Sequence, residues 1–349
     1  MILIRESVPE DNHELQQLQE QCPQGASLIV STVNTPDFFA RVKAYESYKV
    51  FVACDGDRVI GSGACAIRNA IVNGEIKRIG YEFQYFTSPD YRRKSVAKRL
   101  HQQIEKHLAK SGAQLSYALI MEGNLPSMRL FENEGFKIHR KLLMPALVVR
   151  KEMDVFFKGK VRLLKSQDLP RIADLLNTTW KDRELYEPTS TEALTQLISR
   201  LPAFSHDNLL ILEDRGMILA CLGCWDWSNV MRVTVRALNR KLKIIGWVLT
   251  TARIVPDFPK AGSTMKQMML MLMGFKDPMH LAVLIRHANN QALQNGIEEI
   301  FCVCEQDDLL LKSMKGFLRV NTAVYLIIKQ LSENISLPNR PVFVNGIDL

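Results

Sequence analysis

At 349 residues the chain is long enough for two domains, and its 45 Lys and Arg against 37 Asp and Glu give a formal net charge of +8. This charge favours anionic ligands, but no helix-turn-helix, zinc-finger or aromatic RNA-binding signature is present, which argues against nucleic acid. The sequence leads directly into a strand without a secretory signal and holds an odd number of cysteines, seven, so we expect a cytoplasmic protein with reduced thiols. No apolar run approaches the roughly 18 residues that a membrane span needs.

An apolar strand leads through a basic loop directly into a helix. The loop and its flanks include Phe86, Thr87, Ser88, Arg92, Arg93, Lys94, Ser95, Val96 and Ala97. Amides in the first turn of a helix have no partners within it, and the aligned peptide dipoles place partial positive charge there. Three consecutive cations oppose that dipole by about 0.3–1 kcal/mol each, which indicates an anion to hold. The alternative is a solvated basic surface, and neither a Walker loop nor a dinucleotide fingerprint is present.

The elements after the loop follow in a regular order. The next helix has an apolar stripe formed by Val96, Leu100, Ile104 and Leu108. This stripe predicts a helix that stops at Ser111 and Gly112, and residues 114–121 follow as a buried strand. Pro126 suits the first turn of a second helix, and Gly135 suits the residue beyond its end.

These two motifs together resemble the GNAT family of acetyltransferases over about residues 1–150. The family's acyl-CoA loop has the pattern Gln/Arg-x-x-Gly-x-Gly/Ala, which the chain matches at Arg92 and Ala97. It departs at Ser95, where glycine is usual. The family's later pattern, an Asn before a short helix that ends in Gly-Phe, matches at Asn124, Ser127, Gly135 and Phe136.

The resemblance implies an α/β (α+β) fold with a mixed, mostly antiparallel central sheet flanked by helices. It implies that the backbone amides of residues 93–97 bind the pyrophosphate of CoA, and that the splayed strand end at residues 86–88 pairs with the pantetheine arm. Asn124 would hold that arm from the other side. Ser95 is compatible with this loop if its backbone is helical, but it weakens the site if the loop needs a positive φ.

The catalytic residues are less clearly marked than the donor site. Glu82 stands ten residues before Arg92, where several family members place a general-base glutamate, although a strand carboxylate is usually solvated. The family's tyrosine acid falls at Phe131, so the proton donor for the leaving thiolate is missing. Tyr85 and Tyr117 lie on strands near the expected cleft and could replace it, but either could instead be a packing aromatic.

The second half of the chain repeats the order of the first. After a connector at 151–159, residues 161–164 resemble residues 2–5, and residues 209–225 resemble residues 50–67 as two strands joined by a turn. Residues 299–304 with Gly316-Phe317 correspond to residues 115–120 with Gly135-Phe136. We therefore expect a duplication, with a second GNAT-like domain at 160–330 and a tail at 331–349.

The second copy lacks the basic loop. Residues 274–280 instead indicate an ordinary helix start, with Asp277 as a candidate N-cap and Pro278 in the first turn. We expect this copy to have lost CoA binding and to wall the substrate cleft or support the first domain.

An insertion at 229–264 has no counterpart in the first copy. Its cations within residues 232–253, a stretch without Asp or Glu, are Arg232, Arg236, Arg240, Lys241, Lys243 and Arg253. Three functional interpretations are open: a lid over the acceptor site, a contact for acidic substrates, or a helix that touches anionic lipid. The simpler expectation is a basic helix that packs on its own domain.

A metal site is not expected. Four cysteines could be interpreted as metal ligands, namely Cys221, Cys224, Cys302 and Cys304. However, a spacing of three along a strand places Cys221 and Cys224 on opposite faces of the sheet. His101, His107 and His139 show no ligand spacing.

The sequence as a whole predicts an N-acetyltransferase that transfers an acetyl group from acetyl-CoA to an amine by direct attack. The amine could be carried by a small molecule or a peptide, and the oligomeric state is left open. The alternative is a CoA-binding sensor or interaction module with weak catalysis, because Phe131 replaces the acid and Ser95 alters the loop. A nucleic-acid or membrane-surface binder that uses residues 232–253 is a third hypothesis.

Overall fold

The computed structural model describes residues 2–25, 27–252, 258–306, 308–333 and 335–348. The first half comprises β1 (Ile2–Glu6), α1 (Asn12–Glu20), β2 (Leu28–Asn34), β3 (Ser47–Asp55), β4 (Arg58–Val72), β5 (Glu75–Thr87), α2 (Val96–Lys110), β6 (Leu115–Met121), α3 (Leu125–Asn133) and β7 (Lys137–Val148). The second half begins with β8 (Lys160–Leu163), α4 (Leu169–Trp180), α5 (Thr191–Arg200), β9 (Leu209–Asp214), β10 (Met217–Asp226), β11 (Met231–Leu238) and α6 (Arg240–Thr251). It continues with β12 (Thr264–Met265), β13 (Gln267–Phe275), α7 (Pro278–Gln294), β14 (Glu299–Phe301), α8 (Leu309–Ser313), β15 (Arg319–Gln330) and the short helix η7 (Gly346–Asp348).

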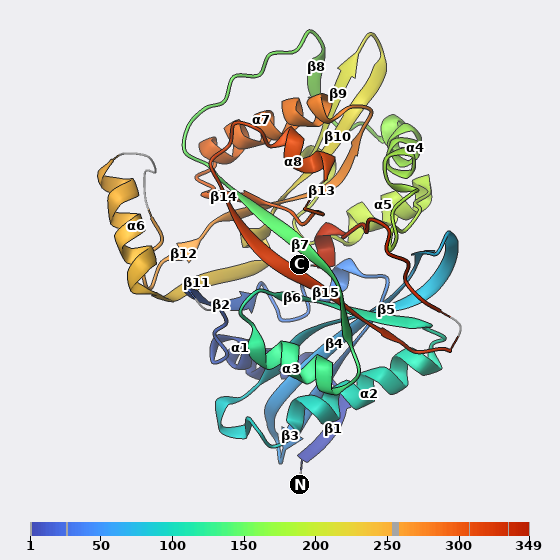
Figure 1. The fold of residues 1–349 in the computed structure, drawn as a ribbon, viewed down its shortest axis with the longest axis vertical. Helices are drawn as coiled ribbons and strands as arrows, with labels where there is room; N and C mark the ends of the chain where they lie inside the picture. Colours follow the sequence, from blue (N-terminus) through green and yellow to red (C-terminus); the bar gives the residue numbers. More distant parts are fainter. Residues whose placement is uncertain (1, 26, 253–257, 307, 334, 349) are drawn as a thin grey trace.

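Twelve strands form one continuous sheet in the order β1-β3-β4-β5-β6-β15-β7-β14-β13-β10-β9-β8. The pairs β5–β6 and β13–β14 are parallel, and the other strand pairs are antiparallel. This confirms the mixed, mostly antiparallel sheet predicted from the sequence. The last strand of each half is exchanged, because β15 lies between β6 and β7 while β7 pairs with β14. Figure 1 shows β7 and β15 crossing between the two halves. The two halves therefore share one sheet instead of forming two separate ones.

Helices cover both faces of the first half's sheet. Leu15 and Leu18 of α1 join the core on one face, and Leu100 and Ile104 of α2 pack on the other. Phe131 of α3 packs against Ala118 and Ile120 of β6. The apolar stripe predicted for residues 96–108 is confirmed, since these side chains are buried.

The two halves repeat each other in detail. Arg5 forms a bidentate ion pair with Asp11 at 2.7 Å, and Arg162 forms the same pair with Asp168 at 2.6 and 3.0 Å. In both, the carboxylate also accepts a backbone N–H three residues earlier. These equivalent contacts support the duplication. They also correct the alignment of the two halves, because Arg162 is equivalent to Arg5, whereas the sequence pattern had aligned it with Leu3.

A β-bulge recurs in both halves. Gln84 in β5 has φ +54° and Leu272 in β13 has φ +48°, and each lies beside a register shift against the neighbouring strand. A positive φ at a non-glycine residue is uncommon within a strand. Its recurrence at one place of each repeat shows that both copies keep the same local kink.

The insertion at 229–264 forms a separate arm. Its strand β11 pairs with β2 of the first half and with β12, making a three-stranded sheet from which α6 stands away (Figure 1). The expectation that its helix packs on its own domain is wrong, because Ile244, Ile245, Trp247 and Val248 are all exposed. Arg253, counted among its cations, lies outside the described residues.

All seven cysteines are free and buried, as the sequence predicts. Cys221 and Cys224 join cores on opposite faces of β10. No group of three or more metal-binding side chains gathers within the described ranges. No helix among those described is long and apolar enough to cross a membrane.

Candidate functional site

β5 and β6 diverge halfway along their length. They pair at Ile79–Leu115, Gly80–Ser116 and Tyr81–Tyr117, and no further pairing between them is found in the described chain. A bulge at Gln84 lies just beyond the last of these pairs. Backbone groups beyond the Tyr81–Tyr117 pair are thus available to an extended ligand lying between the two strands.

The basic loop opens onto the same region from the start of α2. Arg99 N is the first amide of that helix to bond back, to Ser95 O at 3.1 Å. The amides of Ser95, Val96, Ala97 and Lys98 have no acceptor anywhere in the described residues. Four unpaired amides at the positive end of a helix dipole form an anion site.

The conformation of the loop bears on the departure at Ser95. Ser95 has φ +59° and ψ +19°, and Arg93 has φ +62°. The left-handed region costs a residue with a Cβ of the order of 1–3 kcal/mol, which explains why glycine suits this place. The loop therefore does use a positive φ at Ser95, the conformation in which serine is expected to weaken the site.

Neighbouring contacts hold the loop in place. The hydroxyl of Tyr91 donates to Asp55 Oδ2 at 2.8 Å, and Lys94 Nζ lies 4.7 Å from the centre of the Tyr91 ring. The side chains of Arg92, Arg93 and Lys94 are exposed. They leave positive charge around the open amides.

Two buried polar side chains near the splayed strand lack partners. Ser88 Oγ and both amide atoms of Gln84 have none within the described structure, although these residues are only 2% and 7% exposed. A buried polar group without a partner costs about 1–3 kcal/mol, so a ligand that supplies partners would be stabilised there. At Thr87 the carbonyl oxygen already accepts the Cys22 thiol at 3.2 Å. The open amides and these orphaned groups fit a ligand with a pyrophosphate and an amide-bearing arm, as in CoA.

Asn124 and Ser127 lie together at the start of α3, as the second motif predicts. Asn124 Oδ1 accepts the Ser127 N–H at 3.3 Å and caps the helix. Asn124 Nδ2 donates to Gln24 Oε1 at 3.3 Å. The carboxamide is half-buried, and its predicted contact with pantetheine would replace the Gln24 contact.

Glu82 lies in a closed network on the α2 face of the sheet. It accepts hydrogen bonds from the Tyr85 hydroxyl at 2.6 Å and from Ser116 Oγ at 2.7 Å, and His101 Nδ1 lies at 2.9 Å. Its carboxylate is buried and fully surrounded, so an amine substrate has no direct path to it. This geometry does not favour the general-base role predicted for Glu82.

The same network shifts two pKa values. Burial alone would lower the pKa of His101, but the hydrogen bond and charge of Glu82, with Glu105 Oε2 at 3.1 Å, raise it above its ordinary value. Burial and the Glu82 charge raise the pKa of Tyr85 well above its usual range, so its phenol is protonated. Tyr85 also packs edge-on against Phe131, with ring centres 5.3 Å apart, so it adjoins the place of the missing acid.

Tyr117 belongs to a different cluster, on the opposite face. Its hydroxyl donates to Asp348 Oδ2 at 2.9 Å, and Tyr45 donates to Asp348 Oδ1 at 3.1 Å. Tyr81 donates to the Asp348 carbonyl, and Arg68 Nη2 pairs with Oδ2 at 3.0 Å. Since Tyr81 and Tyr117 are the last paired residues of β5 and β6, η7 is anchored where these strands begin to diverge.

Sequence reasoning missed Asp348 and Arg68. Burial raises the pKa of Tyr117 well above its usual range, so it serves as the donor in this cluster. Burial alone would lower the pKa of Arg68, but the Asp348 charge raises it, so the guanidinium stays charged. Neither residue belongs to a periodic pattern or motif, and no sequence signal joins them.

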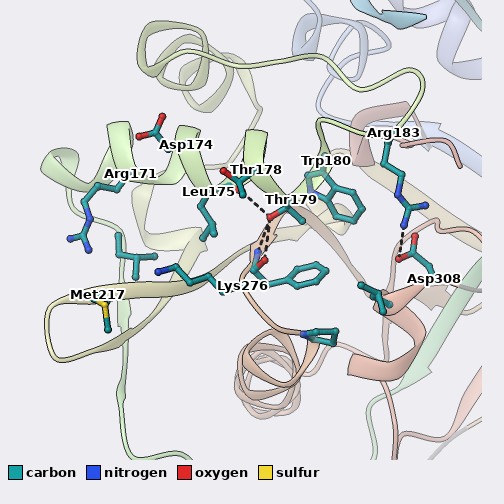
Figure 2. Close-up of a pocket in the computed structure, with 14 residues that line it drawn as sticks. Arg171, Asp174, Leu175, Thr178, Thr179, Trp180, Arg183, Met217, Lys276 and Asp308 are labelled. Atoms are coloured by element: carbon teal, nitrogen blue, oxygen red, sulfur yellow. Dashed lines mark hydrogen bonds and ion pairs between the residues drawn. The ribbon is translucent and has the colours of Figure 1, made fainter. Parts of the chain in front are cut away.

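The second half has its own cavity at the equivalent place. It has a volume of about 690 Å³ and lies between α4, the start of β10, the end of β13 and the starts of α7 and α8 (Figure 2). Arg171 and Lys276 line one end, and Arg183 lies 3.4 Å from Asp308 at the other.

Side chains cap the amides beside this cavity, unlike those at the start of α2. Asp277 Oδ1 accepts the Met279 N–H at 2.7 Å, as predicted for an N-cap, and Thr179 Oγ1 accepts the Phe275 N–H at 3.1 Å. Asp308 caps α8, where the first half has Asn124. Two carboxylates at the helix starts oppose a pyrophosphate, so the lining of this cavity does not favour a second site of the same kind.

Comparison with known families agrees with this geometry. Residues 12–136 match the model described as the Acetyltransferase (GNAT) family. Residues 12–136 are a GNAT-family domain. No curated protein sequence matches the chain significantly.

Solved structures show the same fold across both halves. A Saccharomyces cerevisiae N-myristoyltransferase with bound myristoyl-CoA aligns with a TM-score of 0.67 and 12% identity over 98% of this chain and 84% of its own. A GCN5-related N-acetyltransferase from Anabaena variabilis gives a TM-score of 0.57 and 11% identity over 95% and 73%. The glucosamine N-acetyltransferase region of a fungal β-N-acetylglucosaminidase gives 0.60 and 12% over 94% and 38%. At these identities the likeness shows the fold alone, with the GNAT domain in its first half.

Proposed function

We propose that the protein is an acyl-CoA-dependent N-acyltransferase, with acetyl-CoA as the donor and an amine as the acceptor. The observation that carries this proposal is the meeting of four unpaired amides, Ser95 to Lys98, with the splayed strands of a GNAT-family domain. The amides hold the CoA pyrophosphate, and the surrounding cations of the loop add charge-assisted contacts.

The splayed strands position the thioester. The free end of β5 at residues 86–88 pairs with the pantetheine arm, and Asn124 approaches it from α3. This places the acyl carbon near Tyr81 and Tyr117, where the strands separate. Holding an already activated thioester and an amine in line supplies most of what direct transfer requires.

The leaving thiolate needs a proton, and we assign Tyr85 to supply it. The proton that the amine loses on attack passes through solvent to the Tyr85 phenolate and restores the phenol, so the products are the amide and the free CoA thiol. Tyr85 is mostly buried, carries its proton at neutral pH and packs on Phe131. Glu82 holds the phenol in orientation and so acts as a positioning residue. Tyr117 and Asp348 anchor η7 at the acceptor end of the cleft.

A CoA-binding sensor is the second candidate. It is favoured by the enclosed Glu82 and by the phenylalanine at position 131, which together leave the reaction without the family's usual base and acid. Such a protein would bind CoA and change an interaction without turnover.

Release of free CoA thiol separates the two functions. The full chain is incubated with acetyl-CoA, or with myristoyl-CoA because the Saccharomyces N-myristoyltransferase holds that donor, and with a panel of small amines and peptides. Amine-dependent thiol release that is lost in Arg93→Glu supports the transferase. Tight CoA binding without release for any donor and acceptor would leave the sensor.

A further inference from the structure

The outer face of α6 exposes four large apolar side chains. Trp247 is 70% exposed and Ile244 is 64% exposed, and Ile245 and Val248 are also exposed. Positions 247 and 248 lie one helical turn after position 244, so these three residues and Ile245 form one broad face of the helix. A 12-residue helix with four large apolar side chains in water is unfavourable unless something covers them.

The opposite side of α6 makes the helix's own contacts. Gly246 is buried against the ring of Phe258, and Leu242 and Leu249 on that side are half-buried. Asn239 fixes the start of the helix, because its N–H and its side-chain amide donate to Ser27 O and Ser27 Oγ, each at 2.9 Å. The helix is thus held in one orientation with its apolar face outward, standing away from the body of the molecule (Figure 1).

The charge of α6 identifies what could cover that face. Arg240, Lys241 and Lys243 are exposed in its first turn, and residues 232–253 contain no Asp or Glu. Cations at a helix N-terminus are unfavourable alone, so they favour an anionic counterpart. An apolar layer bordered by negative charge, within reach of one helix, is the chemistry of an anionic lipid surface.

We infer that α6 docks in the interface of an anionic lipid bilayer. Trp247, Ile244, Ile245 and Val248 enter the boundary between headgroups and acyl chains, and Arg240, Lys241 and Lys243 contact lipid phosphates. Trp is suited to this boundary because its ring is apolar and its N–H is polar. The body of the protein remains in water.

Co-sedimentation of the full chain with vesicles tests this inference. Vesicles of phosphatidylcholine alone are compared with vesicles that also contain phosphatidylglycerol. We expect binding to the anionic vesicles, at least about tenfold weaker binding to phosphatidylcholine alone, and loss of affinity as salt is raised.

Three variants assign the binding to α6. Ile244→Ser with Trp247→Ser removes apolar contacts, Lys241→Glu with Lys243→Glu reverses charge, and each pair should lower binding at least about tenfold. Phe156→Ser is the matched control, since Phe156 is an exposed apolar residue outside α6, and it should bind like the wild type. All substituted side chains are exposed, so thermal unfolding midpoints should stay unchanged.

Three results would overturn the inference. The first is no binding by the wild type, and the second is binding to anionic vesicles that the Ile244→Ser/Trp247→Ser variant retains in full. The third is a concentration-dependent dimer, seen by analytical ultracentrifugation, that this variant abolishes, because the face would then be covered by a second copy of the chain.

Discussion

The hydroxyl of Tyr117 donates a 2.9 Å hydrogen bond to Asp348, a residue 231 positions later in the chain. Arg68 shares the same carboxylate oxygen at 3.0 Å, and all three side chains are buried. This contact attaches η7 to the sheet of the first half, at the point where β5 and β6 separate. It makes the last described residues of the chain part of the candidate acceptor end.

Removing Asp348 should destabilise the protein strongly. Asp348→Ala leaves the buried Arg68 guanidinium without its partner, and breaking such a pair costs about 3–5 kcal/mol. Urea unfolding measures the change in the free energy of unfolding, with Asp174→Ala, an exposed carboxylate, as the control. A loss below about 1 kcal/mol for Asp348→Ala would show that the cluster does not hold the two segments together.

Arg93→Glu should weaken CoA binding by about tenfold or more, because it places negative charge against a pyrophosphate. Isothermal titration with CoA measures this change. Lys276→Glu makes the same charge reversal in the cavity of the second half (Figure 2), and it should leave CoA affinity unaltered. Equal effects of the two variants would mean that the loss reflects net charge rather than a specific site.

Ser95→Gly should stabilise the protein by about 1 kcal/mol, because glycine adopts positive φ without the steric cost that serine carries. Ser95→Ala keeps the Cβ and should show no such gain. Urea unfolding of both variants distinguishes conformational strain from loss of the hydroxyl. Equal stability of the two variants would remove the strain explanation.

The Glu82–His101 contact should make stability depend on pH. The pKa of His101 is raised above 6.5 in the folded protein, so the stabilisation is full below that value and is lost as pH rises through the raised pKa. Glu82→Gln should flatten this part of the stability profile, measured by unfolding between mildly acidic and alkaline pH. His13→Gln, an exposed histidine, is the control and should follow the wild type.

Tyr85→Phe should lower the rate of thiol release while CoA affinity stays the same, because it removes the proposed proton donor and not a donor-site contact. Steady-state rates and titration with CoA measure the two properties separately. Tyr117→Phe provides the comparison on the other face of the sheet. An unchanged rate for Tyr85→Phe would mean that solvent or another group supplies the proton to the leaving thiolate.

The sequence was sufficient for the family resemblance and for the mixed, mostly antiparallel sheet. The basic loop, Asn124 and the acidic cap at Asp277 are local motifs, so a few adjacent residues predict them. The placement of Glu82 required knowing what covers its face of β5, and that depends on Ser116 and His101 in other elements. Strand spacing alone could not show that this carboxylate is enclosed.

The exchange of β7 and β15 and the Asp348 cluster were beyond sequence reasoning for a different reason. They join segments hundreds of residues apart, and neither has a periodic signal. For the segment that forms α6, the sequence left outward-facing interpretations open without favouring them, because hydrophobic periodicity identifies an apolar face without identifying its neighbour. The general expectation that such a face packs on its own domain then gave the wrong result.

A structure of the full chain with CoA tests the donor site most directly. We expect the pyrophosphate within hydrogen-bonding distance of the amides of Ser95 to Lys98, with the pantetheine arm between Thr87 and Leu119. CoA bound instead in the second-half cavity beside Lys276, or outside the splayed strands, would contradict it.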